Sequence, residues 1–261
     1  MLYRISDLDG LSLRATDGTI GSVDDFYFDD ATWAIRYLVV DTGHWLSGRK
    51  VLIAPQSVGQ PDLVNRIIPV QLTQEQVRNS PDYDTARPLS RAMEERIYRH
   101  YGWEPYWGEA GLPFAGPTEP RSPDKAGEGD SATPTDEIEQ YELQGLMAGA
   151  DPNLRSAETV MDYYIHARDG DIGHVDDFIV DHEGWVIRYM VVDTGRWLPG
   201  RKVLISTQWI EDMSWSEQTV TLDLNRDEVR HSPDFDTAAN IERPYEKELF
   251  EHYKRAPYWM M

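Results

Sequence analysis

The chain has 261 residues, no cysteine and a formal net charge of −21 at pH 7. The lack of cysteine excludes disulfides, thiolate metal sites and thiol nucleophiles. The acidic balance disfavours nucleic acids and anionic lipid surfaces as partners, because a negatively charged protein repels both.

The N-terminal residues are not expected to be a targeting signal. Its first ten residues, MLYRISDLDG, carry Asp7 and Asp9 where a signal peptide would be apolar. No stretch of the chain reaches the ~20 apolar residues of a membrane span. We therefore expect a cytoplasmic, soluble protein that does not insert into a membrane.

The chain contains a long internal repeat. Residues 20–53 return at 172–205, a shift of 152 residues, and SPDYDTA at 80–86 returns as SPDFDTA at 232–238. This period exceeds any solenoid unit, so each copy is expected to fold as a small domain. The sequence predicts a first repeat at 1–107, a linker at 108–150 and a second repeat at 151–261.

Apolar residues that alternate between glycine-containing turns predict five short β-strands in each repeat. Asp-Gly dipeptides at 17–18 and 169–170 are typical of hairpin turns. Five short strands favour a small barrel or sandwich. The predicted strands are 11–15, 21–29, 34–41, 50–54 and 67–72 in the first repeat, and 163–167, 173–181, 186–193, 202–206 and 219–224 in the second.

Two helices are expected after the strands of each repeat, a short one at 73–79 or 225–231 and then a longer amphipathic one. In the longer helix of the first repeat, Met93, Ile97 and Tyr101 form one apolar stripe. Gly102 is expected to end this helix, and Pro244 to lie near the start of its counterpart. We expect the stripe to pack on the barrel of the same chain, with a subunit interface as the alternative. The second repeat carries the stripe as Tyr245, Leu249 and Tyr253.

The linker is rich in Gly, Pro, Ser and Thr, and it holds 9 acidic and 2 basic side chains. This composition predicts a flexible acidic segment. A short helix at 137–147 is an alternative for its last part.

Three sequences in each repeat resemble a known family: VDDF, WxIRYxVVDTG and WLxGRKVLI. They resemble the PRC-barrel domain, named after the cytoplasmic domain of the photosynthetic reaction-centre H subunit; the barrel is similar, more weakly, to the C-terminal domain of the ribosome maturation factor RimM. The resemblance implies a mainly β fold with short helices: two tandem small SH3-like β-barrels, each followed by a C-terminal amphipathic helix. It also implies docking to other macromolecules, and it brings no catalytic residues.

Paired aspartates are the best candidates for a metal or acid–base site. Asp24-Asp25 recurs as Asp176-Asp177, and paired carboxylates can bind a divalent cation. Neighbouring residues of a strand point to opposite faces, however, so the two carboxylates of each pair are expected to diverge.

Two arginines lie on otherwise apolar strands. Arg36 and Arg188 are expected to form ion pairs, either with the paired aspartates or with Asp41 and Asp193. Phosphate binding is the alternative use of these side chains.

Histidines give a weaker metal signal. His174 and His182 lie near the second aspartate pair, but the first repeat has no histidine at either place. No glycine-rich phosphate loop and no nucleophile elbow occurs. We predict no catalytic residue, no cofactor site and no metal site.

Tryptophans recur in pairs between the repeats, and most are expected to lie in the core or over the barrel ends. The pair Trp45 and Trp197 differs, because each lies in the loop TGxWLxGRK beside Arg-Lys. An aromatic residue on a loop is a good contact residue for a partner protein. The predicted partner-binding residues are Trp45, Arg49, Lys50, Trp197, Arg201 and Lys202.

We therefore expect a non-enzymatic protein-binding or scaffolding module with a protein partner. The two repeats are expected to pack as an intramolecular pseudo-dimer or to bind two copies of a partner, and homo-oligomers are an alternative. A peripheral factor of a membrane complex, bound through protein contacts as the reaction-centre H subunit resemblance implies, is a second hypothesis. A metal-dependent enzyme that uses the aspartate pairs and an RNA-binding protein are less favoured.

Overall fold

The structure is a computed structural model, and it describes residues 1–85, 87–107, 151, 153–195 and 197–260. The predicted linker at 108–150 lies outside these residues. The contacts divide the chain into two compact units, one formed by Met1–Tyr83 with Asn153–Met261 and the other by Asp84–Pro152. We call residues 1–83 the first half and residues 153–260 the second half of the larger unit.

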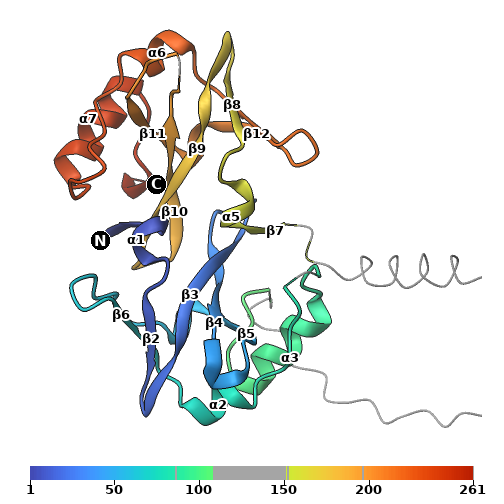
Figure 1. The fold of residues 1–261 in the computed structure, drawn as a ribbon. Helices are drawn as coiled ribbons and strands as arrows, with labels where there is room; N and C mark the ends of the chain where they lie inside the picture. Colours follow the sequence, from blue (N-terminus) through green and yellow to red (C-terminus); the bar gives the residue numbers. More distant parts are fainter. Residues whose placement is uncertain (86, 108–150, 152, 196, 261) are drawn as a thin grey trace, which may run out of the picture. The chain divides into compact units, whose positions relative to one another are not determined.

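The first half is built on a sheet with the strand order β5-β4-β3-β2-β6 (Figure 1). β2 and β6 are parallel, and the other neighbours are antiparallel. The buried residues of β3 and β4 include Phe26, Phe28 and Tyr37, which lie at the centre of this half's core. The strands are β2 (Ser12–Ala15), β3 (Gly18–Asp29), β4 (Ile35–Asp41), β5 (Lys50–Ile53) and β6 (Ile67–Pro69).

The second half repeats this order and adds one strand, giving β11-β10-β9-β8-β13-β12. The five strands predicted in each repeat are confirmed, as is the mainly β fold with short helices. β12 was not predicted, and no pairing among the described strands closes either sheet into a barrel. The strands are β8 (Tyr164–Ala167), β9 (Gly170–Asp181), β10 (Val186–Asp193), β11 (Lys202–Ser206), β12 (Ile210–Ser214) and β13 (Thr219–Leu222).

Glycine is required where β3 and β9 cross the end of the next strand. Gly21 and Gly173 have φ values of 154° and 147°. A Cβ atom at either position would clash with the carbonyl oxygen of Asp41 or Asp193. The close approach of β3 and β9 to the backbone of the next strand therefore requires a residue without a side chain.

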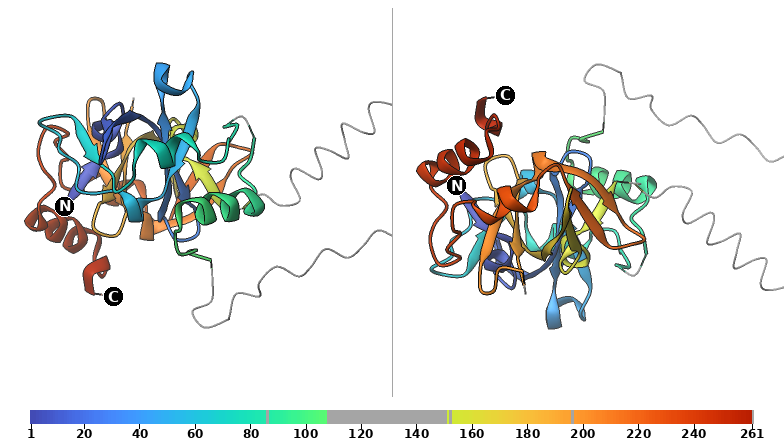
Figure 2. Two further views of the ribbon diagram at one scale, coloured as in Figure 1. Left: turned by 90° about the horizontal axis from the view of Figure 1, so that it is seen from below. Right: turned by 90° about the horizontal axis from the view of Figure 1, so that it is seen from above.

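The two halves exchange their first strands. β1 (Leu2–Arg4) pairs with β9 of the second half, and β7 (Leu154–Ser156) pairs with β3 of the first half. Figures 1 and 2 show the blue N-terminal strand among the strands of the second half. Each sheet is therefore completed by residues from the other repeat.

The halves meet at an approximate two-fold axis. Ala34 forms an antiparallel bridge with Val186, which is its own counterpart in the repeat. The flanking bonds are reciprocal: the N–H of Ile35 donates to the carbonyl of Trp185 at 2.7 Å, and the N–H of Ile187 donates to the carbonyl of Trp33 at 2.8 Å. Such self-matching contacts define an isologous interface, here within one chain.

Aromatic side chains fill the space beside this bridge. Phe28 of the first half lies 5.9 Å from Phe178 of the second half, and Trp33 stacks on Phe28 at 5.3 Å. Trp185 stacks on Phe26 at 6.5 Å. Both phenylalanines at the junction are fully buried, so the pseudo-dimer has a continuous apolar core.

Short helices follow the exchanged strands and the sheets. α1 (Ile5–Leu8) and α5 (Ala157–Val160) follow β1 and β7, and α2 (Gln74–Arg78) and α6 (Arg226–Arg230) follow the sheets. α2 begins with a capping box between Thr73 and Gln76, and α6 begins with one between Asn225 and Glu228. The two short helices predicted after the strands are thus confirmed to within one residue at each end.

The predicted amphipathic helices are α3 (Arg91–Tyr101) in the smaller unit and α7 (Arg243–Tyr253) in the larger one. Gly102 ends α3 in the left-handed conformation, as predicted. The stripe of α7 packs on its own half, where the ring of Trp209 lies 4.4 Å from Tyr253 and 5.3 Å from Phe250. No helix in the described parts of the chain has both the length and the apolar character needed to cross a membrane.

The Tyr-Trp pair after each long helix folds back onto the start of that helix. Tyr258 donates to Glu246 at 2.8 Å, and Arg243 lies 4.0 Å from the ring of Trp259. In the smaller unit Tyr106 donates to Glu94 at 2.8 Å, and Arg91 lies 4.5 Å from the ring of Trp107. Both glutamates are buried, so the tyrosine hydroxyls and arginines compensate two otherwise costly charges.

Candidate functional site

The predicted contact loop lies between β4 and β5 in the first half and between β10 and β11 in the second. Its two tryptophans are half-buried. Arg78 lies 5.5 Å from the ring of Trp45, whereas Arg226 and Arg230 lie 4.8 and 5.7 Å from the ring of Trp197. Each indole is therefore held by cation–π contacts from the short helix of its own half, with part of the ring open to solvent.

The arginines of this loop bind the C-terminal ends of the same short helices. Arg49 donates to the carbonyls of Arg78 at 3.1 Å and Pro81 at 3.0 Å, and it forms an ion pair with Asp82 at 3.1 Å. Arg201 repeats this pattern with the carbonyls of Arg230 and Ser232, and it pairs with Asp234 at 2.7 Å. A cation is favoured at a helix C-terminus, so these side chains fix the loop to the fold.

The loop lysines pair with the first aspartate of each Asp-Asp pair. Lys50 lies 2.5 Å from Asp24, and Lys202 lies 2.6 Å from Asp176. The hydrogen bond that Lys50 donates to Asp24 raises the pKa of Lys50. The first carboxylate of each pair therefore belongs to an ion pair on the sheet surface.

The second aspartate of each pair accepts hydrogen bonds from a short helix of the other half. Asp177 accepts from the N–H of Ser6 at 3.2 Å and from its hydroxyl at 2.5 Å, at the start of α1. Asp25 accepts from the N–H of Glu158 in α5 at 3.0 Å. Burial raises the pKa of Asp25 and Asp177 above the ordinary aspartate value. The two carboxylates of each pair diverge, as predicted, and they do not form a shared metal or acid–base site.

The strand arginines have partners other than those expected. Arg36 pairs with Asp29 at 2.9 Å, and Arg188 pairs with Asp181 at 3.4 Å. The expectation of pairing with the Asp-Asp pairs, Asp41 or Asp193 was wrong. The chain turns back after β3 and after β9, and this turn places the last residue of the strand, Asp29 or Asp181, beside the arginine of the next strand. Burial opposes ionisation of Asp29, but hydrogen bonds from Arg36 and Thr32 outweigh it and lower the pKa of Asp29.

The two histidines near the second aspartate pair do not come together with it. His182 lies 3.1 Å from the carbonyl of Met1 and forms an edge contact with Tyr3 at 5.6 Å, and His174 is part of β9. No group of three or more metal-binding side chains occurs within the described parts of the chain.

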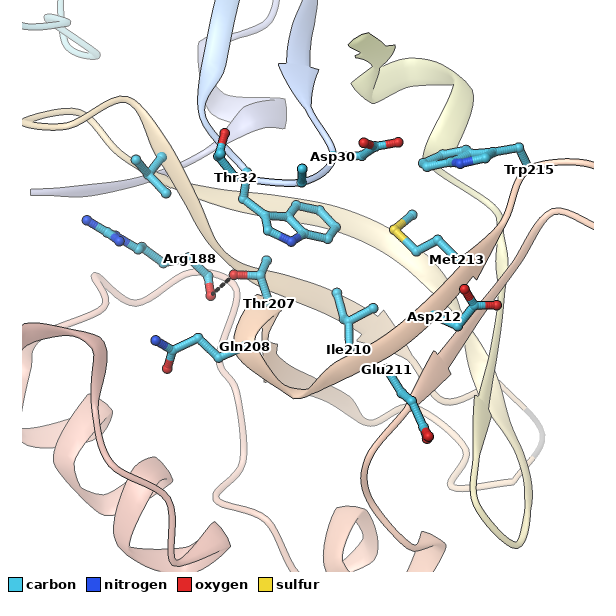
Figure 3. Close-up of a pocket in the computed structure, with 13 residues that line it drawn as sticks. Asp30, Thr32, Arg188, Thr207, Gln208, Ile210, Glu211, Asp212, Met213 and Trp215 are labelled. Atoms are coloured by element: carbon cyan, nitrogen blue, oxygen red, sulfur yellow. Dashed lines mark hydrogen bonds between the residues drawn. The ribbon is translucent and has the colours of Figure 1, made fainter. Parts of the chain in front are cut away.

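A cavity that the sequence did not predict lies between the halves. It has a volume of about 590 Å³ and is formed by the β3–β4 turn of the first half and by a segment around β12 of the second (Figure 3). Asp29 shapes the turn by accepting from the N–H of Thr32 at 2.9 Å, and Trp33 follows with a φ of 61°. The lining residues are Asp30, Ala31, Thr32, Trp33, Val186, Arg188, Thr207, Gln208, Ile210, Glu211, Asp212, Met213 and Trp215.

The cavity has apolar side chains at its centre and charged residues near its ends. In Figure 3 the side chains of Ile210 and Met213 face the turn that carries Asp30 and Thr32. The side chain of Glu211 points away from that turn. Arg155 of β7 lies 4.2 Å from the ring of Trp215 and forms an ion pair with Asp30 at 3.0 Å. The exchanged strand therefore fixes one end of the cavity.

The two repeats differ in sequence at the segment that lines this cavity, and this difference is the signal from which the cavity could have been suspected. Residues 207–218 read TQWIEDMSWSEQ, whereas the matching residues 55–66 read PQSVGQPDLVNR. The second repeat gains a strand and Trp215 there, but the first has Leu63 and only isolated bridges at Val58 and Asp62. A segment that departs from an otherwise close repeat is a candidate for a task that only one copy performs.

Comparison with known families gives one match. The model of the PRC-barrel domain matches residues 1–77, which span β1 to β6 and most of α2. No curated protein matches the chain.

Proposed function

Because residues 1–77 match the model of the PRC-barrel domain, we propose that this protein is a non-enzymatic protein-binding or scaffolding module. The observation that carries the proposal is the reciprocal exchange of β1 and β7, which joins two similar folds into one body. A single chain thereby offers two copies of the same surface at a fixed spacing. Linked sites of this kind raise the effective concentration of the second contact, so weak individual contacts suffice.

In this proposal the contact residues are Trp45 and Trp197. Each ring is half-buried on a loop whose backbone is held by an arginine and a lysine, so its orientation is set before a partner binds. Preorganised aromatic residues lose little conformational entropy on binding. Arg49, Lys50, Arg201 and Lys202 complete the proposed site by holding this loop in place, with part of each side chain exposed.

The aspartate pairs also support a non-catalytic reading. Asp24 and Asp176 are used in ion pairs, and Asp25 and Asp177 accept from helices of the opposite half. Each carboxylate thus has a structural partner that accounts for its presence.

The test replaces both loop tryptophans. We expect the double variant Trp45→Ala/Trp197→Ala to keep its circular dichroism spectrum and to lose a protein that the wild-type chain captures from native lysate. The matched control Trp45→Phe/Trp197→Phe keeps an aromatic ring on each loop and should retain that protein. If the alanine variant unfolds, the tryptophans belong to the core; if it folds and still captures the protein, the loops are not the contact site.

A further inference from the structure

β12 is an edge strand with an open side. Among the described strands it pairs with β13 alone, and it ends the sheet of the second half. No backbone hydrogen bond from Glu211 to Ser214 on the opposite side joins it to any other described segment. An unpaired strand edge presents N–H and C=O groups that can pair with an added strand.

The cavity lies beside β12. Four consecutive residues of β12, Ile210–Met213, line it. The register with β13 shifts between Ile210 and Asp212, so the regular alternation of side chains is interrupted there, and Glu211 and Asp212 are both exposed. The cavity is therefore lined by four neighbouring residues of the strand rather than by one of its faces. An extended segment placed there could reach both the backbone of β12 and the apolar side chains of the cavity.

The two carboxylates of β12 form no ion pair with any residue that the structure describes. Asp30 pairs with Arg155, and Arg188 pairs with Asp181. Glu211 and Asp212 are exposed, and within the described residues neither has a charged partner. The uncompensated charge along this edge is therefore negative.

This charge selects among occupants of the edge. A second copy of a chain with a net charge of −21 is repelled, as is the acidic segment 108–150. A basic segment is attracted. Acidic side chains on an edge strand prevent pairing with another acidic chain, but they do not prevent pairing with a basic one.

We propose that β12 binds an extended, basic segment of a partner protein, which adds to the sheet as a further strand and inserts an apolar side chain between Trp33 and Met213. This inference rests on the proposed protein-binding function and names the partner's chemistry. The first half has no described strand at the matching place, so the part of the chain that the structure describes has one such site. The tryptophan loops, in contrast, are present twice.

The test uses the full chain and a fluorescein-labelled peptide of about seven residues, in which lysine alternates with valine around a central phenylalanine. We expect saturable binding with one peptide per chain, weakened by added salt, and slower hydrogen exchange at the amides of residues 211–214. The same peptide with glutamate in place of lysine should not bind.

The variant Glu211→Lys/Asp212→Lys should weaken binding by about tenfold or more, because it replaces two attractions with two repulsions. Glu217→Lys is the matched control, since Glu217 is exposed on the same hairpin but does not line the cavity. It should leave binding within about twofold.

Three results would overturn the inference. These are no binding of the basic peptide, equal binding by the charge-reversed variant, or hydrogen exchange that slows elsewhere on peptide binding but not at residues 211–214. Concentration-dependent dimerisation that the charge-reversed variant abolishes would identify a second copy as the occupant and would also overturn it. The proposed function fails separately. If the basic peptide does not bind, but the Trp45→Ala/Trp197→Ala variant still loses the protein that the wild-type chain captures, the scaffold stands and the β12 site falls.

Discussion

Adjacent aspartates in this protein carry out different tasks because the strand alternates their directions. Asp176 points to the sheet surface and pairs with Lys202, whereas Asp177 is 4% exposed and binds the start of α1. The second contact crosses from one half to the other. A single residue therefore links local strand geometry to the joining of the two repeats.

Replacing Asp177 tests this link. Asp177→Ala removes the acceptor for the N–H and hydroxyl of Ser6 and for the N–H of Phe178, and should lower the free energy of unfolding by about 1–3 kcal/mol in urea titrations. Asp177→Asn keeps one acceptor oxygen and should lower it less. Equal losses in the two variants would mean that packing, and not hydrogen bonding, is what Asp177 contributes.

The pH dependence of Asp177→Asn has a definite sign. Burial raises the folded-state pKa of Asp177, so the folded protein binds this proton more tightly than the unfolded chain does. The protonated Asp177 therefore contributes to stability at pH values below its pKa in the unfolded chain. This contribution is lost as the pH rises through its pKa in the folded protein. Relative to wild type, Asp177→Asn should become more stable as pH rises from about 4 towards 7. A constant difference across that range would contradict the raised pKa.

The two long helices end with different residues in the same conformation. α3 ends at Gly102 with φ 70°, whereas α7 ends at Lys254 with φ 52°. Glycine adopts this left-handed conformation without strain, but a residue with a Cβ atom does not. The repeat thus contains its own comparison of a favourable and an unfavourable helix end.

Lys254→Gly should stabilise the protein by about 0.5–1 kcal/mol, because the strain at φ 52° is removed and Lys254 is exposed. The measurement is the urea midpoint of the variant against wild type. Lys254→Ala is the control, since it removes the lysine side chain but keeps the strain. Stabilisation by alanine as large as that by glycine would show that the charge, and not the backbone, is responsible.

The exchanged strand β1 can be tested in the same way. Deleting residues 1–4 removes the pairing with Ile179, Val180 and Asp181 and the buried ring of Tyr3. We expect faster hydrogen exchange in β9, in the second half, although the deletion lies in the first repeat. Exchange that rises only near the new N-terminus would contradict the strand exchange.

The interface between the halves sets the behaviour of the whole molecule. The continuous core at Phe28 and Phe178 and the bridge between Ala34 and Val186 belong to both repeats. Either repeat alone would expose this apolar surface and lose the strand that completes its sheet. Because the interface is isologous, a second copy of the same repeat can replace the missing one.

An isolated second repeat, residues 151–261, should therefore form a homodimer in which two copies of β7 are exchanged. Sedimentation velocity over a range of concentrations measures this directly. Phe178→Asp, which buries a charge in the interface, should shift the equilibrium to monomer or prevent folding. A stable, well-folded monomer of the unmodified repeat would show that the interface is dispensable.

The duplicated architecture could be predicted from the sequence, because apolar alternation, Asp-Gly turns, capping residues and the 152-residue shift are local or periodic signals. It also determined that the aspartates within each pair diverge, since that follows from strand geometry alone. The partners of Arg36 and Arg188 could not be inferred this way, because they depend on how a turn places the end of one strand beside the next.

Three features could be seen only once the chain is folded: the exchange of β1 and β7, the contacts of Asp25 and Asp177 with the opposite half, and the position of the cavity beside β12. These features join residues that are far apart in sequence, and three-residue strands are too short to leave a periodic pattern. The physical reason is that a short segment gains stability from the sheet that receives it, and no property of the segment itself records which sheet that is.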